Sequence, residues 1–482
     1  MTQSTARQYG GSKIEDGTGN LPPAVIVSAA FAFLVFGLGP NAVLAAGSLL
    51  VLLVILALFW RPGEPPVLVY VFVFQWLEAS VWVFYANLHD LPIDDGTTIG
   101  ADRHLATVLL LVGILVQSVG ARLSIGAWRI RDRQLAELQL RRYSQDTWFK
   151  LYLASLAVAA GAGFLARLIP PLSQPLLALV YVKWAAYVIF TFATFFRSDT
   201  NKGLWLLVFS LELLFSLGDY FSSFKFVFLF TFLGVFAAEV RFSARLKVMI
   251  TAVVFLALFF GAIWSAIKGD YRYFVSGGKQ AQVVEVDFPE RIAKLTELTT
   301  NLDGADVLDG FDTLLKRIEY VEYFGDVTNY VPAVLPHTNG ERWLDAIMRP
   351  FMPRLLFPDK SVIDESYLTN RFTGLYVAGM DEGTQISLGY MAETYIDFGQ
   401  YAMMPVLFLW GLFLGWVYRW LMQSENSRGV LGMGFACAIL VMTSSSIGNS
   451  LAKLVGGLVV SLLVAWLFNR IVVPRWLPWL RA

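Results

Sequence analysis

Charged residues inside the apolar part of the chain are the first candidates for chemistry. A charge within a membrane-spanning helix costs free energy unless it is paired or hydrated, so such residues are usually functional. Four of them stand out: Glu78, Lys183, Glu212 and Lys225. Their positions along the apolar runs place all four in the same half of the bilayer, which predicts one intramembrane polar cavity opening on that side. The alternative is mutual ion pairing, for example of Glu78 with Lys183, that only holds helices together.

Further cations gather in a long polar segment of the chain. Arg349, Arg354 and Lys360 lie in the Pro-rich, aromatic stretch MRPFMPRLLFPDKS, while Arg317 and Arg371 lie before and after it. A guanidinium group matches phosphate oxygens in a bidentate way, and a lysine adds a compact charge. These cations are therefore candidates for binding a lipid-linked diphosphate without a metal ion. The alternatives are anchoring to lipid headgroups and, for Arg317 and Arg371, a solvated surface charge.

Two residues of the same segment are candidates for a general base. Glu393 lies in GYMAETYIDFG, between Tyr390 and Tyr395 and shortly before an apolar run. A partly desolvated glutamate there could accept a proton, although it could equally be a structural partner for one of the cations. His337, in the turn-like sequence LPHTNG, is its rival because histidine titrates near neutral pH. A lone histidine in a loop is, however, more often incidental.

The usual signatures of cofactor and metal chemistry do not occur in the sequence. It has no Gly-rich phosphate loop followed by Lys-Ser/Thr, no His-Glu-x-x-His and no Ser-centred nucleophile elbow. Because Cys437 is the single cysteine, an intrachain disulfide is excluded, and only three histidines are present. We therefore expect neither a cofactor nor a metal ion.

The composition indicates that a membrane must hold these residues in place. Of the 482 residues, 56% are hydrophobic and only 15% are charged, and the mean hydropathy is +0.58. These values are typical of a polytopic membrane protein and argue against a soluble enzyme. Lys and Arg equal Asp and Glu at 37 each, so the net charge predicts no nucleic-acid partner.

Twelve apolar runs are candidates for membrane-spanning helices, because about 20 apolar residues cross a bilayer as a helix. They are found near 21–38, 42–60, 67–86, 105–126, 149–169, 176–197, 203–217, 222–240, 248–267, 402–422, 430–448 and 453–473. The sequence thus predicts an all-α polytopic fold with about twelve transmembrane helices. The runs at 203–217 and 222–240 could instead form one broken, re-entrant hairpin.

Orientation follows from the preference of Lys and Arg for cytoplasmic loops. Under twelve crossings, the basic residues near 129–142, 241–247 and 470–481 fall on one side, so both termini are expected in the cytoplasm. The segment 268–400 has 21 Asp and Glu against 12 Lys and Arg and is expected on the other side. The expected organisation is a disordered cytoplasmic tail at 1–20, spans one to nine at 21–267, a periplasmic loop domain at 268–400, spans ten to twelve at 401–473 and a cytoplasmic tail at 474–482.

The segment 268–400 is expected to be mostly helical and to carry the chemistry, since long ordered loops are usually functional. Apolar residues recur at helical spacing from Val307 to Val321 and again from Trp343 to Phe351. Each stretch should therefore lay one apolar face on the bilayer or on the helix bundle.

The C-terminal half resembles the bacterial oligosaccharide repeat-unit polymerases (Wzy-type, O-antigen polymerase-like). The resemblance covers roughly 205–422. It rests on the motif elements Pro353-Arg354, Phe357-Pro358, Lys360, Glu393, Tyr395, Phe398 and Gly399, and on LGDYFSSFKFVFLF, which carries Lys225.

What the resemblance implies is a metal-independent glycosyltransferase on the outer face of the bacterial inner membrane. It would transfer a growing glycan from undecaprenyl diphosphate to a sugar hydroxyl of the next lipid-linked repeat. Lys225, Arg317, Arg354 and Lys360 would then neutralise the lipid diphosphate, with Arg349 and Arg371 as further candidates. Glu393, or its rival His337, would serve the acceptor hydroxyl. A flippase and a chain-length regulator of the same pathway, together with membrane lipids, would be its partners.

Three alternatives to polymerisation remain open. A related ligase would move a finished glycan to another acceptor by the same chemistry. A polysaccharide or lipid exporter would also place polar residues in the outer half of the bundle, but it must expose its site to both faces. A non-catalytic partner of a polysaccharide synthase is the last alternative.

Overall fold

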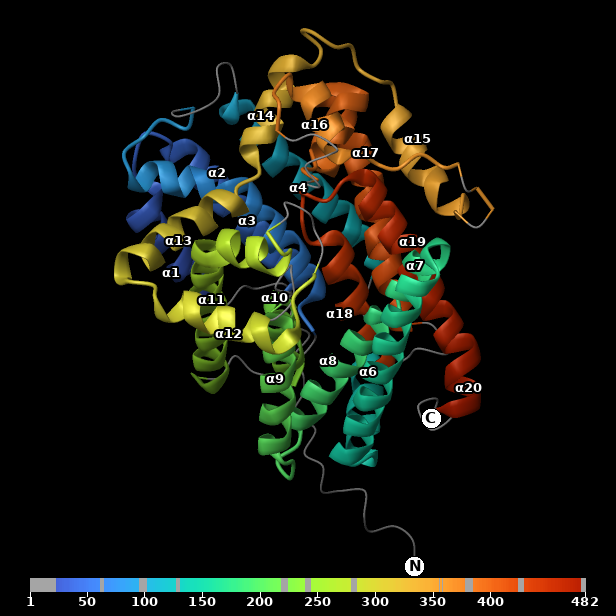
Figure 1. The fold of residues 1–482 in the computed structure, drawn as a ribbon. Coiled ribbons are helices and arrows are strands. Elements are labelled where there is room, and N and C mark those ends of the chain that lie inside the picture. The colour runs from blue at the N-terminus through green and yellow to red at the C-terminus, as the bar shows by residue number, and fades with distance from the viewer. Residues whose placement is uncertain are drawn as a thin grey trace, which may run out of the picture.

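The computed structural model describes residues 23–60, 65–94, 102–126, 131–217, 224–238, 244–278, 284–354, 356–357, 359–377, 385–423 and 429–477. These residues form helices joined by turns and short connections, and no strand occurs among them (Figure 1). The prediction of an all-α fold is confirmed for this part of the chain. The expected tail at 1–20, most of the tail at 474–482 and the motif residue Pro358 lie outside it.

Within the described ranges, eight helical segments are long and apolar enough to cross a membrane. They are Ala42–Phe59 (α2), Val67–Leu88 (α3), Arg103–Ile125 (α4), Gln145–Leu168 (α6), Pro170–Phe196 (with α7, Ser173–Leu177, and α8, Val180–Phe196), Thr251–Val275 (within α11, Ala244–Val275), Tyr390–Gln423 (α17) and Leu451–Arg475 (with α19, Leu451–Leu467, and the start of α20, Val473–Trp476). Each coincides with one of the expected apolar runs. The chain is therefore a multi-pass membrane protein by the length and composition of its helices.

The four other expected runs form shorter helices. They are Val25–Gly37 (with α1, Pro23–Ala32), Lys202–Leu217 (α9), Phe224–Ala238 (α10) and Val430–Ser444 (α18). Helices α9 and α10 pack against each other, as either a hairpin or two crossings would require. Twelve crossings thus stay a prediction, which requires that each of these four shorter helices crosses the membrane. A further polar helix, α5, spans Arg131–Arg142.

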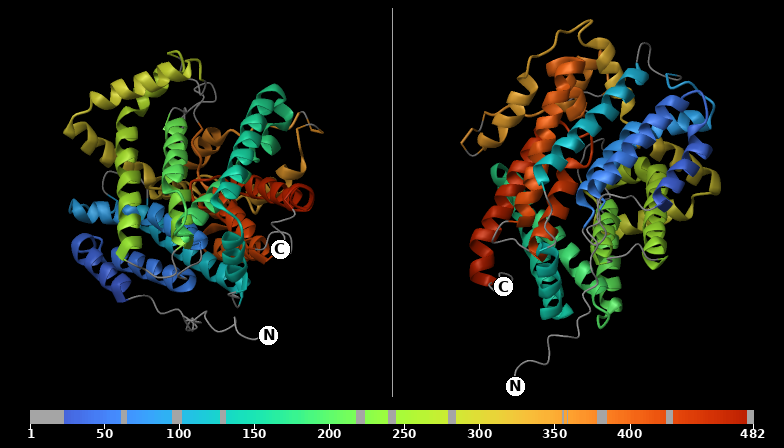
Figure 2. Two further views of the ribbon diagram at one scale, coloured as in Figure 1. Left: turned by 90° about the horizontal axis from the view of Figure 1, so that it is seen from below. Right: turned by 180° about the vertical axis from the view of Figure 1, so that it is seen from behind.

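The long polar segment is helical, as expected. Its helices are α12 (Phe288–Thr300), α13 (Gly304–Ile318), α14 (Val321–Tyr330), α15 (Glu341–Met348) and α16 (Glu365–Thr373). Figure 1 shows α14, α15 and α16 at one end of the bundle, while α12 and α13 run across its side; the two further views show the same arrangement (Figure 2).

Helix α13 lies with its apolar face on the bundle, as its periodicity predicts. It begins at a capping box, in which Asp303 and Asp306 each accept the other's backbone N–H at 3.0 and 2.9 Å. Its Gly310 approaches the carbonyl of Ala262 on α11, and its Leu314 packs at Gly261. This contact fixes the C-terminal end of α13, and therefore Arg317, beside the bundle.

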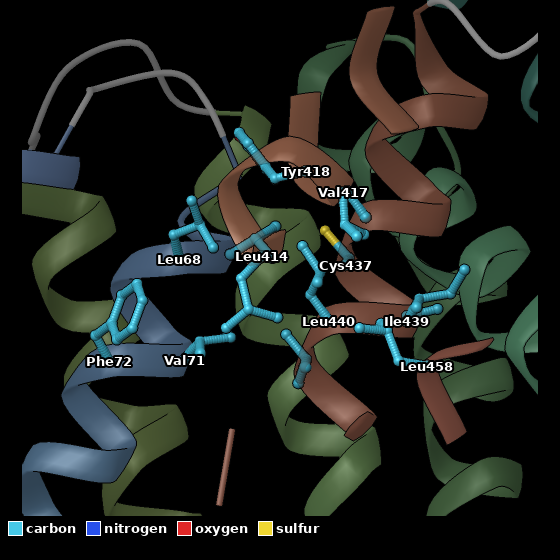
Figure 3. Packing of buried hydrophobic residues seen from close by; sticks show 14 of the residues in the cluster. Leu68, Val71, Phe72, Leu414, Val417, Tyr418, Cys437, Ile439, Leu440 and Leu458 are labelled. Atoms are coloured by element: carbon cyan, nitrogen blue, oxygen red, sulfur yellow. The ribbon is translucent and has the colours of Figure 1, made fainter. Parts of the chain in front are cut away.

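Apolar side chains from α3, α17, α18 and α19 lie together in the bundle. Leu68 and Val71 of α3 point toward Leu414 of α17, while Val417 of α17 lies beside Cys437 of α18, and Leu458 of α19 completes the cluster (Figure 3). Cys437 of α18 is fully buried in this cluster. Since lipid offers no hydrophobic driving force between helices, this close packing is what holds α3, α17, α18 and α19 together.

Small residues allow α4 and α17 to make the most extensive contact between any two described helices. Gly411 and Gly415, one helical turn apart on α17, approach the backbone of Gln117 and Ala121 on α4. A Cβ at either glycine would collide with a carbonyl oxygen of α4. This is the small-xxx-small packing of membrane helices.

We predict that Gly415→Ala destabilises the protein by about 1–3 kcal/mol, because the added methyl group must push α4 and α17 apart. Thermal unfolding in detergent or nanodiscs, followed by intrinsic fluorescence, measures the effect. The matched control is Gly161→Ala in α6, where an added Cβ meets nothing within 4 Å. Equal melting temperatures for the two variants would contradict the close approach.

Candidate functional site

Three buried carboxylates from different helices bind one short connection. This connection is the α18–α19 turn, residues 445–450, between the last two long apolar helices. The carboxylates are Glu78 of α3, Glu365 of α16 and Glu393 of α17, which are 6%, 3% and 3% exposed. Because a buried carboxylate is costly unless it accepts hydrogen bonds, the donors of each one define the local structure.

Glu78 fixes the start of the turn. Its two carboxylate oxygens accept the hydroxyl of Ser446 and the backbone N–H of Ile447, both at 2.6 Å. Its backbone carbonyl accepts the N–H of Tyr320, which joins α13 to α14, at 3.1 Å. The carbonyl of Ile447 in turn accepts the N–H of Tyr390, the first residue of α17, at 3.2 Å. Glu78 therefore ties the turn to the polar segment as well as to α3.

Glu365 and Glu393 fix the end of the turn and the start of α19. Glu365 accepts the hydroxyl of Ser450 and the ammonium of Lys453, each at 2.5 Å. Glu393 accepts the first backbone N–H of α19, from Leu451, at 3.0 Å. Both carboxylates thus lie at a helix N-terminus, where unpaired N–H groups and the helix dipole favour negative charge.

The second oxygen of Glu393 binds Arg342, a residue of α15. Arg342 donates from Nε at 3.3 Å and from Nη2 at 3.1 Å. Arg342 was not among the candidates that the sequence suggested, although a structural partner for Glu393 was one of the alternatives. Glu393, which was expected to act as a base, thus accepts hydrogen bonds from Arg342 and from the first N–H of α19.

Asp397, one turn further along α17, holds the start of α15. Its carboxylate, 1% exposed, accepts the backbone N–H groups of Arg342 and Trp343 at 3.1 and 2.9 Å and the hydroxyl of Thr338 at 2.5 Å. The indole of Trp343 also donates to Thr394 at 3.0 Å. Helix α15 therefore has a fixed orientation on α17, which determines where its arginines point.

A pocket of about 160 Å³ opens where α15, α16 and α19 meet. Its polar lining includes Arg342, Asp345, Arg349, Asp364, Tyr367 and Ser450. Arg349, in the 3₁₀ turn after α15, donates to Asp345 at 2.6 Å and to Ser361 at 3.2 and 3.3 Å. Two guanidinium groups, each paired with one acid, thus line a single pocket at one end of the bundle.

Lys360 and Arg354 lie beside this pocket and do not line it. Lys360 donates to the carbonyls of Arg349 and Met352 at 2.6 and 3.0 Å, so it braces the connection after α15. Partial desolvation, followed by the charges of Arg349 and Arg354, lowers the pKa of Lys360. Arg354 is exposed. Arg371 is exposed on α16, where its guanidinium lies 5.1 Å from the ring centre of Phe372.

The other predicted cations belong to a second group, on α10, α11 and α13. Arg317 at the end of α13 interacts electrostatically with Lys225 of α10 and with Lys268 of α11. Partial desolvation, followed by the charge of Arg272 on α11, lowers the pKa of Arg317. Glu78 also acts on Lys225, so one of the three carboxylates lies within electrostatic reach of this group. Five of the six cations suggested by the sequence are thus divided between two places, and Arg371 belongs to neither.

Lys183 and Glu212 form an ion pair of their own inside the bundle. The ammonium of Lys183 on α8 lies 2.7 Å from Glu212 on α9, and Tyr152 of α6 donates to the same carboxylate. The structure therefore brings Lys183 together with Glu212, while Glu78 binds the α18–α19 turn. Lys183 thus forms an ion pair that joins two helices, as one alternative expected. Its partner, however, is Glu212 and not Glu78.

His337 lies against the break in α17. Gly399 has φ +70°, a conformation that favours glycine, and it interrupts the helix shortly after Asp397. The imidazole covers this glycine, since a Cβ there would lie 3.0 Å from Nε2, and its Nδ1 is 3.2 Å from the carbonyl of Ile396. The histidine thus contacts α17 and does not line the pocket.

Some of the missed residues carry a sequence signal and others do not. Arg342 and Asp345, which were missed, are spaced by three and four residues from each other and from the predicted Arg349, which places them on one helical face. That spacing could have identified the polar face of α15. Glu365 and Asp397, by contrast, bind partners about 85 and 55 residues away in the chain, at Ser450 and Arg342. Periodicity contains no information about such contacts.

Comparison of the chain with protein-family models, with curated proteins and with solved structures gives no match. Within the described part of the chain, no three His, Cys, Asp or Glu side chains are close enough to hold a metal ion. The function must therefore be argued from the two cation groups and the buried carboxylates.

Glu319, between α13 and α14, is a further buried acid beside the site. Its side chain is 4% exposed, lies 3.9 Å from Nε of Arg103 and accepts the N–H of Glu322 at 2.8 Å. Burial raises the pKa of this carboxyl to about 7, although the charge of Arg103 opposes the shift. The folded state therefore holds a proton that the unfolded chain releases near pH 4.5.

From this raised pKa we predict that Glu319 lowers the stability of the protein as the pH rises from about 4.5 to about 7. Glutamine does not titrate, so the Glu319→Gln variant does not lose stability in this way. Its free energy of unfolding relative to that of the wild type should therefore rise by up to about 3 kcal/mol between pH 5 and pH 8. Melting temperatures across that range measure it. Glu322→Gln, on a 41% exposed side chain paired with the same arginine, is the control. An equal pH dependence in both variants would rule out the assignment to Glu319.

Proposed function

We propose that this protein is a glycosyltransferase of the bacterial inner membrane that polymerises oligosaccharide repeat units carried on undecaprenyl diphosphate. The observation that supports this most is the pocket lined by Arg342 and Arg349, which lies at the end of a membrane-spanning bundle. The sequence resemblance to Wzy-type polymerases points to the same chemistry. In this proposal the polar segment 268–400 faces the periplasm and both termini face the cytoplasm.

Both arginines keep hydrogen-bond donors for an anion in the pocket. A guanidinium has five N–H donors. Arg342 uses two of them on Glu393, and Arg349 uses three on Asp345 and Ser361. The remaining donors suit the oxygens of a diphosphate, because charge-assisted hydrogen bonds from a guanidinium to phosphate oxygens are strong even when one edge of the guanidinium is already paired with an acid.

The reaction needs cations where the leaving group develops charge. A sugar hydroxyl of the acceptor attacks the anomeric carbon of the donor glycan, and the bond from that carbon to the diphosphate oxygen breaks. The hydroxyl proton passes to a base, and the lipid diphosphate leaves with the electron pair. Donors that neutralise this charge lower the barrier more than donors that bind the ground state. We assign this role to Arg342 and Arg349, with Lys360 and Arg354 beside them.

The division of the cations into two groups fits a reaction with two lipid-linked substrates. The donor and the acceptor each carry a diphosphate, so each requires its own cations. We propose that the pocket holds one diphosphate and that the group of Lys225, Lys268 and Arg317 receives the other. Arg371, exposed and outside both groups, has no place in this scheme.

Glu393 fits the role of a positioning residue better than that of a base. Both of its oxygens already accept hydrogen bonds, from Leu451 and from Arg342. Asp345 lines the pocket with a side chain that is 41% exposed, so it is the carboxylate that an acceptor hydroxyl could approach. We therefore place the base at Asp345 and the support of Arg342 at Glu393. His337 as a base stays a prediction.

The test is complementation of a strain that lacks its own copy of this protein. Arg342→Ala and Arg349→Ala should each reduce long-chain surface polysaccharide by on the order of 100-fold and leave single repeats, because a lost transition-state donor costs about that much. Arg349→Lys, which keeps the charge, should lose less. Gels of surface polysaccharide and blots of the protein give the readout, and Arg371→Ala is the matched control.

Three results would contradict this proposal. An unchanged ladder in the deletion strain would remove the polymerase function, and an unchanged ladder in both arginine variants would remove the site. Long lipid-linked glycan that accumulates undelivered in the deletion strain would indicate a ligase.

A second pair of variants separates the two roles of Glu393. If Glu393 holds Arg342, then Glu393→Gln should retain part of the ladder, because the single amide oxygen can still accept from Arg342, although the amide NH2 then replaces the oxygen that accepts the N–H of Leu451. Glu393→Ala should lose the ladder, since it leaves Arg342 without its partner. A complete loss in both variants, at normal protein levels, would restore Glu393 as the base.

A further inference from the structure

The connection that carries the pocket arginines also exposes an apolar edge. We call the described residues 341–354, 356–357 and 359–363 the arm; they comprise α15, the 3₁₀ turn Arg349–Phe351 and the connection toward α16. Its exposed apolar side chains outside the pocket, between 42% and 71% accessible, are Leu344, Ile347, Met348, Phe351, Leu356 and Phe357. So many large apolar residues on a short segment exceed what a water-exposed loop usually presents.

The apolar edge and the polar face of the arm point in different directions. Arg342, Asp345 and Arg349 face the pocket, while Leu344 and Ile347, which alternate with them along α15, are exposed. Trp343 is not part of this edge, because its ring packs against Trp410 of α17 at 5.6 Å. The apolar residues that the periodicity assigned to one face of α15 therefore lie on two surfaces. Trp343 packs on the bundle, while Leu344 and Ile347 are exposed on the outside.

The arm adjoins the surface that a membrane must cover. Both α15 and the turn Arg349–Phe351 pack against α19, one of the eight helices able to span a membrane. Further along α19, Leu463 and Trp466 are 51% and 49% exposed, as expected for side chains that face lipid. Figure 1 shows α15 on the outside of the bundle, next to the end of α17 and α19. The apolar edge therefore continues a lipid-facing surface at the end of the helix.

The charges of the arm suit a lipid surface. Arg354 is exposed between Phe351 and Leu356, both of which are also exposed. Interfacial segments combine apolar side chains, which enter the bilayer, with cations that remain at the headgroup phosphates. Lipid is therefore the occupant that this combination fits, because a protein partner would not explain the continuity with α19.

We propose that the arm is embedded in the bilayer surface, with its apolar edge among the lipid chains and Arg354 at the headgroups. The pocket, lined by the arm on one side and by Ser450 of the α18–α19 turn and Ala452 of α19 on the other, then opens sideways to the membrane. An amphiphile with a phosphate headgroup reaches the arginines from within the lipid layer and does not have to leave it. This inference concerns the placement of the arm and holds whether or not the protein is a polymerase.

Depth-dependent quenching by labelled lipids tests the placement. The native Cys437 is fully buried, so a cysteine introduced by Leu356→Cys is the position that reacts with the fluorophore NBD. The full-length protein is reconstituted in vesicles of phosphatidylethanolamine and phosphatidylglycerol that contain doxyl-labelled lipid. We expect strong quenching by shallow doxyl lipid and protection from iodide in the aqueous phase.

Two further labels provide matched controls. Leu463→Cys on α19 should be quenched by doxyl lipid, whereas Val334→Cys, 60% exposed in the connection between α14 and α15, should be quenched by iodide. Phe351→Cys provides a second position on the arm in case Leu356→Cys does not fold. The proposal is overturned if the arm labels behave like Val334 and not like Leu463. Loss of polymer in the complementation assay has no influence on this result.

Discussion

The structure depends on how three buried carboxylates are satisfied. Glu78, Glu365 and Glu393 come from three separate helices, and each would be costly in an apolar environment without its hydrogen bonds. All three find their donors in the turn between α18 and α19 or at the start of α19. The turn therefore cannot move without leaving a buried charge unpaired. Its hydrogen bonds join the membrane-spanning bundle to the polar segment.

The geometry of the pocket also follows from buried carboxylates. Glu393 and Asp397 lie one turn apart on α17, so a single helix face holds both the side chain of Arg342 and the N-terminus of α15. The break at Gly399 ends this stretch before the helix continues. Arg349 then lies about two turns beyond Arg342, in the 3₁₀ turn that follows α15. The positions of both pocket arginines are thus set by one segment of α17, with no contribution from long flexible connections.

The sequence could predict the helices but not most of their pairings. Lipid requires every backbone group to be hydrogen-bonded within a helix, so the apolar runs specify the helical segments almost by themselves. Charge in those runs marked Lys183, Glu212 and Glu78, and the structure places the first two in an ion pair and the third against the α18–α19 turn, while the single polar cavity expected around them stays a prediction. Their partners depend on which helices are neighbours, and a stretch that is apolar on all sides gives no such information. Arg342 was missed for this reason, since its importance depends on Glu393.

The paired state of the arginines bears on how the pocket could work. Each guanidinium is neutralised by one acid, so the empty pocket contains no large uncompensated charge that would destabilise the fold. An arriving diphosphate finds donors that are already held in place, and preorganised donors lose little entropy on binding. The free energy needed to hold these donors in place is supplied during folding, by the hydrogen bonds of the carboxylates that bind the α18–α19 turn. Stability and anion binding therefore rest on the same acids, which is why the Gln and Ala variants of Glu393 should differ.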